Sequence, residues 1–287
     1  MKKSAFTIIE LSVVLAIIIF LVSGIIGSSV MIKNARLASA RNTTVDSNIS
    51  NISGLLAWYE TSLKESFLTA QRTENSQLSS WFDISPQSIA NQRNTLTKSA
   101  NSSVVYIENG INNIPSIRFN GSDKFTIASL FQGSSNQITV FLVLKPEFTP
   151  SSTQIIPFDA HVAQSRFSLG IKNNAVQLNA GSGSDTLTAA NPANFINSKN
   201  YIICAYFNLS NSMVFVNDLN NMAGNSQINA GTNALTGLSI GADKNTASGF
   251  TGLISEVIIF NRPLKLDERR NVMSYLSTKY KINITGT

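Results

Sequence analysis

The chain has 287 residues, of which 13% are charged, and its formal net charge at pH 7 is +6. This length allows one large or two modest domains. The basic residues are scattered, without the dense aromatic-interleaved strip that single-strand binders use, so we do not expect nucleic-acid binding. Cys204 is the only cysteine and His161 the only histidine, which excludes an intrachain disulfide and a metal site with two histidine ligands.

An apolar, uncharged segment runs from Leu11 to Ile32. It has the about 20 residues that a membrane-crossing helix needs. Three interpretations are open. The segment is a secretory signal with an A-x-A-like cleavage site at Ala38 and Ala40, a plain membrane anchor, or a segment in which Glu10 has a specific functional role. An ionised carboxylate is costly in hydrocarbon, so Glu10 requires a partner.

The stretch "SAFTIIELSVVLAIIIFLVSG" resembles the amino-terminal signal of type IV pilins and type II secretion pseudopilins. The resemblance implies a leader over residues 1–5, cleavage by a prepilin peptidase between Ala5 and Phe6, and N-methylation of Phe6. The family most often has glycine before the cleaved bond, where this chain has Ala5. In the family, the glutamate that corresponds to Glu10 compensates the terminal amine of a neighbouring subunit during filament assembly. Such a pairing makes a buried carboxylate tolerable.

The same resemblance implies partners and a location. Other pilin subunits would contact the N-terminal helix. The chain would be a single-pass protein of the bacterial inner membrane, with its span at about residues 11–32, and would then move to the pilus and cell surface or to a periplasmic pseudopilus. Val45, Ile49, Ile52 and Leu56 recur at helical spacing, so we expect the stalk helix to cover residues 6–53. The Asn- and Ser-rich stretch after Asn42 is nevertheless poor in helix formers.

From Leu55 onward, short apolar or alternating runs are separated by turn-forming Asn, Ser and Gly. Many such runs without helical patterns between them predict an antiparallel β-sandwich or jelly roll. In the tail "LKLDERRNVMSYLSTKYKI", Val272, Met273, Leu276 and Tyr280 share one face, which predicts a helix over about 266–280. The predicted fold class is mainly β, with a long N-terminal α-helix, an antiparallel β-sandwich and a short C-terminal helix.

Four segments, "GLLAWYE", "LSSWFDIS", "NGINNIPSIRFNGSDKF" and "GFTGLISEVIIFNRPL", resemble in this order the concanavalin A-like, laminin-G-like jelly roll of many secreted bacterial proteins. The resemblance covers roughly residues 54–282, and we assign residues 54–287 to this domain. It implies that Trp58 and Trp81 are core residues rather than residues that stack on sugars.

Glycoside hydrolases of this fold need two carboxylates that face each other across a cleft. On one strand these would appear as acids at alternate positions, and no such segment occurs, because Glu256 is alone in "LISEVIIF". We therefore expect no enzymatic activity. Relatives often hold Ca²⁺, which takes carboxylate and carbonyl oxygens. Asp123, Asp218 and Asp243 are the candidate loop residues for a ligand or for Ca²⁺, although aspartate in turns usually serves turn geometry.

These patterns support one leading hypothesis and two alternatives. The leading hypothesis is a pilin-like, minor subunit of a type IV filament that displays a lectin-like domain for adhesion to a glycan or a surface. The first alternative is a type II secretion pseudopilin whose large domain is a scaffold or a substrate receptor. The second is a DNA-uptake pilin, which would bind DNA in a salt-sensitive manner. The assignment of adhesion rests on analogy of fold.

Overall fold

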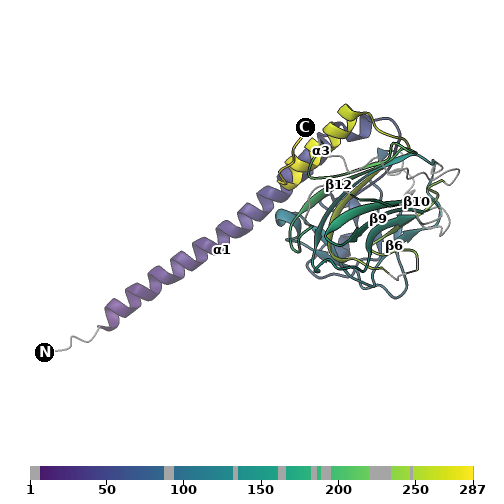
Figure 1. Ribbon diagram of the computed structural model, residues 1–287. Helices are drawn as coiled ribbons and strands as arrows, with labels where there is room; N and C mark the ends of the chain where they lie inside the picture. The colour runs from purple at the N-terminus through teal and green to yellow at the C-terminus, as the bar shows by residue number, and fades with distance from the viewer. Residues whose placement is uncertain are drawn as a thin grey trace.

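The computed structural model describes residues 7–86, 94–131, 135–160, 166–181, 186–188, 195–219, 234–245 and 248–286. A long helix projects from a two-layered β-sandwich, and a second helix lies across one face of the sandwich (Figure 1). The prediction of an antiparallel β-sandwich followed by a short C-terminal helix is confirmed.

The projecting helix, α1, extends over Ile8–Val45. Its start is fixed by a reciprocal pair of hydrogen bonds. The backbone N–H of Glu10 donates to Thr7 Oγ1 at 3.2 Å, and the backbone N–H of Thr7 donates to Glu10 Oε2 at 2.8 Å. This is a capping box, which satisfies two amides that the first turn of a helix leaves without partners. Glu10 therefore has a partner within its own chain.

The prediction that the stalk helix continues to residue 53 is wrong. α1 ends at Val45, and a 3₁₀ turn, η1 (Asn48–Asn51), follows it. The side chain of Val45 is exposed, whereas Ile49 is buried in the domain, so the two do not share one helical stripe. Asn, Ser and Asp side chains compete for backbone hydrogen bonds, which explains the early end of the helix.

The prediction of a membrane span at residues 11–32 is also wrong, and with it the single-pass inner-membrane location. Within the part of the chain that the structure describes, no helix combines the length and the hydrophobicity that crossing a bilayer requires.

One layer of the sandwich is a seven-stranded sheet in the order β13-β12-β7-β15-β5-β4, with β1 also paired to β15. All pairs between its strands are antiparallel. Its strands are β1 (Leu55–Glu60), β4 (Val105–Ile107), β5 (Ser116–Asn120), β7 (Ile138–Pro146), β12 (Tyr201–Phe207), β13 (Met213–Val216) and β15 (Thr251–Phe260).

The other layer is an eight-stranded antiparallel sheet in the order β11-β10-β9-β8-β14-β6-β3-β2. Its strands are β2 (Ser80–Trp81), β3 (Leu96–Lys98), β6 (Phe125–Ile127), β8 (Ile155–Ala160), β9 (Arg166–Lys172), β10 (Ala175–Gly181), β11 (Thr186–Thr188) and β14 (Leu238–Ile240). Two short 3₁₀ turns, η2 (Lys64–Ser66) and η3 (Thr69–Gln71), lie between β1 and β2 and so connect the two layers, and a third, η4 (Ile111–Asn113), lies between β4 and β5 of the seven-stranded sheet.

Two apolar cores stabilise the domain. The first lies between the sheets and contains Trp81, Phe119 and Phe125, whose rings make edge-on and tilted contacts. The second lies on the outer face of the seven-stranded sheet, which α3 (Leu266–Tyr280) covers. Trp58 belongs to this second core, so both tryptophans are core residues, as the sequence predicts.

Candidate functional site

Two loops pack directly on each other at one end of the sandwich, and we call them the loop pair. The first covers residues 120–124, between β5 and β6, and the second covers residues 241–245 and 248–250, between β14 and β15. The N–H of Gly121 donates to the carbonyl of Phe250 at 3.0 Å. A Cβ on Gly249 would lie 1.6 Å from the carbonyl oxygen of Gly121, so only glycine permits this approach of the two backbones.

The loop pair brings together two of the three predicted aspartates. Asp123 is buried, and its two carboxylate oxygens accept hydrogen bonds from the backbone N–H groups of Ser103 and Asn120. Asp243 is also buried, and its Oδ1 accepts from the N–H of Ser248 at 2.9 Å. Asp243 and Asp123 therefore each fix the conformation of their own loop, which is a usual role of aspartate in turns, and Asp123 also ties its loop to Ser103 between β3 and β4.

The third predicted aspartate lies elsewhere. Asp218 follows β13 at the edge of the seven-stranded sheet and forms a bridge with Thr285 near the C-terminus. There, the N–H of Leu219 donates to the carbonyl of Thr285, and the N–H of Thr285 donates to the carbonyl of Asn217, both at 3.0 Å. Asp218 thus anchors the C-terminal segment and does not join the loop pair.

The residues of the loop pair do not fit a Ca²⁺ ion. Lys124 Nζ donates to the carbonyl oxygens of Asp243 and Lys244, so an ammonium group occupies oxygens that a cation would need. The carboxylate of Asp123 is used by backbone amides. No group of three or more His, Cys, Asp or Glu side chains within the described ranges has an arrangement that could hold a metal ion.

Exposed polar side chains stand on this rigid base. Asn120, Ser122 and Asn245 are exposed, and Asn120 Oδ1 accepts from both the N–H and the hydroxyl of Ser122 at 3.2 and 3.0 Å. Amides and hydroxyls donate and accept hydrogen bonds, as sugar hydroxyls also do. A polar surface held by buried carboxylates and glycine contacts can therefore bind a polyhydroxylated ligand without much reordering.

A buried cluster of charges lies under α3. Glu60 of β1 and Glu256 of β15 are paired across the strands, and both accept from Lys279 of α3. The Nζ of Lys279 lies 2.9 Å from Glu60 Oε2 and 2.7 Å from Glu256 Oε2, and all three side chains are 0% exposed. Burial opposes ionisation of Glu60, but Lys279 and the hydroxyls of Ser62 and Ser66 outweigh it, so its pKa is lowered. Burial likewise opposes the charge on Lys279, but the two glutamates outweigh it and raise its pKa.

Aromatic donors complete this cluster. Glu256 accepts from Trp58 Nε1 at 2.7 Å, from the Tyr275 hydroxyl at 2.7 Å and from the Tyr280 hydroxyl at 2.9 Å. Burial, reinforced by the negative charge of Glu256, keeps the pKa of both tyrosines well above its usual value, so both remain donors. The cluster joins α3 to the sheet. Its two facing carboxylates have no contact with solvent.

Sequence reasoning missed Glu60 and Lys279 as partners of Glu256. The signal for Lys279 was present, because it follows Val272 by seven residues and therefore lies on the apolar face of α3. For Glu60, the sequence shows only an acid at the end of an apolar run. Its pairing with Glu256 depends on strand register, which the sequence does not state.

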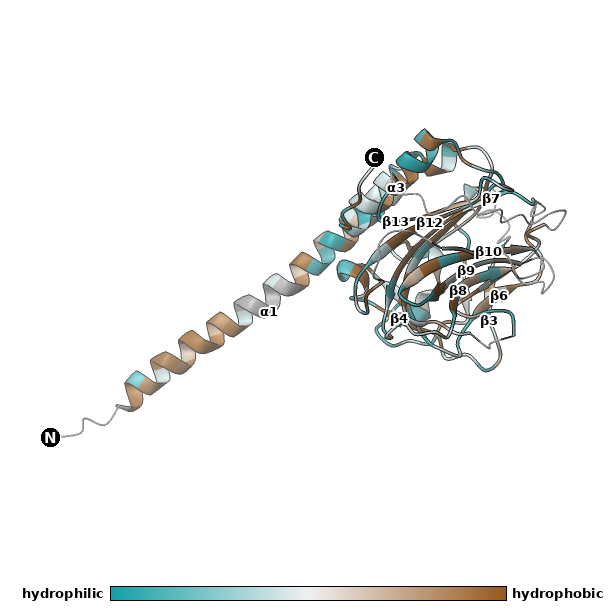
Figure 2. Ribbon diagram, viewed as in Figure 1, coloured by the Kyte–Doolittle hydropathy of each residue, from teal (hydrophilic) through white to brown (hydrophobic). Residues whose placement is uncertain are grey.

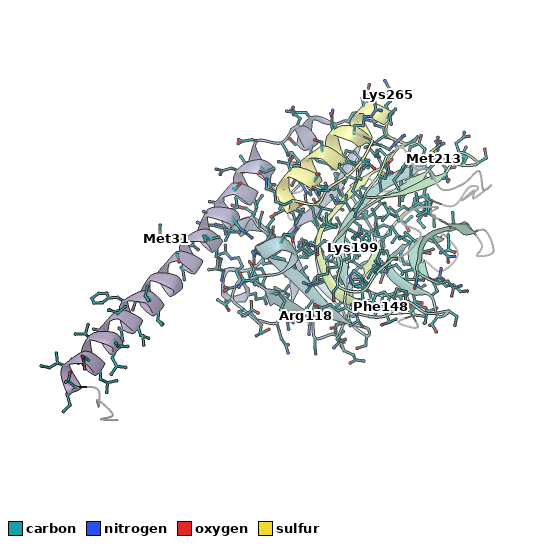
Figure 3. All side chains as sticks on the ribbon, turned by 60° about the vertical axis from the view of Figure 1, so that its left-hand side comes forward. Met31, Arg118, Phe148, Lys199, Met213 and Lys265 are labelled. Atoms are coloured by element: carbon teal, nitrogen blue, oxygen red, sulfur yellow. The ribbon has the colours of Figure 1, made fainter. Side chains whose placement is uncertain are left out.

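The N-terminal half of α1 is a second candidate for function. Its apolar side chains are exposed, from Ile8 at 88% to Val22 at 48%. Hydropathy colouring marks hydrophobic residues along the projecting part of the helix (Figure 2), and the side chains drawn at its N-terminal end, like that of the labelled Met31, stand clear of the sandwich (Figure 3). Ala5 and Phe6, the predicted processing site, lie outside the described residues.

Glu10 lies at the exposed end of α1. The hydrogen bond from the Thr7 backbone N–H, followed by the one from the Thr7 hydroxyl, lowers the pKa of Glu10, so this carboxylate is ionised at neutral pH. A negative charge at the first turn also interacts favourably with the helix dipole. The T-x-x-E pattern that marks this cap is visible in the sequence "TIIE".

Comparison with known proteins agrees with this architecture. The family model described as the concanavalin A-like lectin/glucanases superfamily, laminin G type, matches residues 119–268. No curated protein matches the chain in sequence.

Three solved structures illustrate the likeness in fold. Domain 4 of an extracellular GH43 arabinanase from Geobacillus stearothermophilus, solved with arabinotriose, superimposes with a TM-score of 0.54 at 20% identity and covers 77% of this chain and 97% of that domain. The ligand-binding domain of botulinum neurotoxin serotype D, solved with N-acetylneuraminic acid, gives 0.52 at 14%, covering 79% and 52%. Trypanosoma rangeli sialidase, solved with the inhibitor DANA, gives 0.51 at 14%, covering 77% and 33%. At these identities the likeness is one of fold, and this chain spans only about half of the neurotoxin domain and a third of the sialidase.

Proposed function

Because the chain belongs to the concanavalin A-like lectin/glucanases superfamily, we propose that its β-sandwich is a lectin-like domain that binds a carbohydrate through the loop pair. The observation that carries this proposal is the set of exposed polar side chains, Asn120, Ser122 and Asn245, on loops fixed by the buried Asp123 and Asp243. The structures of similar fold include proteins solved with arabinotriose and with N-acetylneuraminic acid, which supports a sugar as the class of ligand.

We propose binding without catalysis. Hydrolysis of a glycosidic bond needs one carboxylate to protonate the leaving oxygen and a second to act as base or nucleophile, both in contact with the sugar. The two carboxylates that face each other, Glu60 and Glu256, are 0% exposed and held by Lys279. Asp123 and Asp243 accept hydrogen bonds from backbone amides.

A glycan array probed with the full chain in mild detergent tests this function. We expect binding to a defined subset of glycans, and we expect Asn245→Ala to weaken that binding. Asn271→Ala is the matched control, because Asn271 is equally exposed but lies on α3. If Asn245→Ala binds as well as the unchanged chain, the sugar site does not lie at the loop pair. If the chain binds no glycan across a broad array, the proposal as a whole is contradicted.

A second function is favoured by the exposed apolar surface of α1. We propose that α1 packs against α1 of other copies in a pilin-like assembly, since contiguous apolar surfaces of this size usually mark interaction sites. In this proposal a prepilin peptidase cleaves between Ala5 and Phe6, and Glu10 pairs with the new amine of a neighbouring copy. The intact mass of the chain from its native host tests the cleavage, because removal of residues 1–5 has a defined mass difference.

Two variants separate the pairing of Glu10 from its capping role. Glu10→Ala removes the carboxylate, whereas Thr7→Ala removes the hydroxyl that caps the Glu10 N–H and keeps the carboxylate and its bond from the backbone N–H of residue 7. We expect chemical crosslinking between copies to fall in Glu10→Ala and to persist in Thr7→Ala. Equal loss in both variants would assign the effect to the cap, and no loss in either would reject the pairing.

A further inference from the structure

A cavity of about 380 Å³ lies where α1 meets the β-sandwich, away from the loop pair. α1 contributes Lys33 and Arg41 to its lining, and η2 contributes Lys64. Arg72, directly after η3, and Tyr106 of β4 complete the part of the lining that carries the argument. The volume is within the range of cavities that hold small organic ligands, which is roughly 300–1,000 Å³.

The charge of this cavity is strongly unbalanced. Four cationic side chains line it, and the one acid of the lining, Glu108, forms an ion pair with Lys33. In the part of the chain that the structure describes, no carboxylate pairs with Lys64, Arg41 or Arg72. Three positive charges around one cavity repel each other, and a bound anion would remove that repulsion.

The hydrogen bonds of the two arginines leave this charge in place. Arg41 Nε donates to the carbonyl of Ser62 at 2.7 Å, and one terminal nitrogen of Arg72 donates to Thr69 Oγ1 at 2.6 Å. Both acceptors are neutral. The Nε of Arg72 is buried and, among the described residues, has no hydrogen-bond partner. Arg118 and Arg269 also have a buried Nε without a partner among the described residues, but Arg72 is the one of the three that lines this cavity. Buried donors in native proteins nearly always have an acceptor, and a ligand oxygen in the cavity would supply one for Arg72.

The cavity also has an uncharged wall. Leu37, Leu63, Pro115 and the largely buried Tyr106 contribute apolar surface, and Asn113 contributes an amide. Burial raises the pKa of Tyr106 to about 12, with Arg41 and Arg72 opposing the shift, so the phenol is neutral at pH 7. Apolar ring and chain surface beside amide and guanidinium groups suits a sugar ring with hydroxyls and one carboxylate, because guanidinium binds carboxylate in a bidentate manner.

We propose that this cavity is a second carbohydrate site and that it binds a carboxylate-bearing sugar, with Arg72, Lys64 and Arg41 as the cationic partners of the carboxylate. The inference rests on the proposed carbohydrate-binding function and names a substrate class for it. It also gives the junction between α1 and the sandwich a role, since neither part forms the cavity alone.

Calorimetric titration of the full chain with D-glucuronic acid tests this inference, with D-glucose and inorganic phosphate as comparison probes. We expect D-glucuronic acid to bind more tightly than either, and its affinity to fall as salt concentration rises. Arg72→Gln should weaken it about tenfold, which corresponds to about 1.4 kcal/mol. Lys64→Gln, at an exposed position, should weaken it in the same direction, and Lys172→Gln on β9 is the matched control that should leave it unchanged.

The outcomes distinguish this site from the loop pair. D-glucuronic acid binding no better than D-glucose, or binding unchanged in both Arg72→Gln and Lys64→Gln, would overturn the inference. Phosphate binding as tightly as D-glucuronic acid would show a general anion site and would also overturn it. Binding that survives Asn245→Ala but not Arg72→Gln supports this cavity even if the loop pair fails its own array test.

Discussion

Replacing Lys279 with methionine tests whether the two buried glutamates depend on this one cation. Lys279 donates to Glu256 at 2.7 Å and to Glu60 at 2.9 Å, and all three groups are 0% exposed. Methionine fills a similar volume without charge, so the variant leaves two carboxylates buried against each other with no counter-charge. Breaking a buried ion pair by removing one partner costs about 3–5 kcal/mol.

The structure places the expected cost near the lower end of that range. Without Lys279, Glu60 still accepts from the backbone and hydroxyl of Ser62, from the N–H of Leu63 and from the hydroxyl of Ser66. Glu256 keeps its three aromatic donors. These hydrogen bonds continue to satisfy the oxygens, so we expect the free energy of unfolding to fall by about 3 kcal/mol at pH 7.

Urea unfolding followed by circular dichroism measures this change. Arg270→Met on the same helix is the control, because Arg270 pairs with the exposed Asp267 at 3.6 Å, and exposed pairs contribute about 0–1 kcal/mol. The loss in Lys279→Met should shrink as the pH is lowered toward 5, where a buried glutamate without its cation takes up a proton. A loss below about 1 kcal/mol, or one that does not change with pH, would refute the reasoning.

Two further predictions concern Asp83 and Gly241. Burial raises the pKa of Asp83 to about 6, although hydrogen bonds from its neighbours act in the opposite direction. Folding therefore favours the neutral carboxyl. The stability that this neutral carboxyl contributes is fully present below about pH 4 and is lost as the pH rises through 6. We expect the free energy of unfolding to fall by about 1 kcal/mol between pH 5 and pH 7. In Asp83→Asn, urea unfolding at both pH values should no longer show this fall. A variant with the same pH dependence as the unchanged chain would show that another group causes it. Gly241 has φ +99°, and an added Cβ would lie 2.2 Å from the ring of Phe119. Gly241→Ala should therefore lower the free energy of unfolding by about 1–3 kcal/mol and the melting temperature by several degrees. An unchanged melting temperature would contradict this close contact.

Local patterns predicted the layers of this protein well. Alternating β-branched and aromatic runs indicated the sandwich, and the 3.6-residue spacing of Val272, Leu276 and Tyr280 indicated α3. The burial of Trp58 and Trp81 was expected from the likeness of their segments to the laminin-G-like domain, and it is confirmed. Strands and helices depend mainly on residues that are close together in the sequence, and the spacing of apolar residues therefore predicts them.

Long-range pairings could not be predicted in the same way. Lys279 and Glu60 are 219 positions apart and meet only because β1 pairs with β15 under α3. The cavity beside α1 likewise combines α1 with three 3₁₀ turns and β4. Two predictions that relied on apolar residues alone were wrong. The apolar segment near the N-terminus predicted a membrane span. The helical spacing of Val45 and Ile49 predicted a continuous stalk helix, although polar side chains between these two residues end the helix.

The central claim, that the loop pair binds a carbohydrate, is tested most directly by a crystal structure of the full chain with the glycan that binds most strongly on the array. The account predicts a sugar in hydrogen-bond contact with Ser122 and Asn245, above the buried carboxylates of Asp123 and Asp243. A sugar seated on another face of the sandwich, with the loop pair empty, would contradict it.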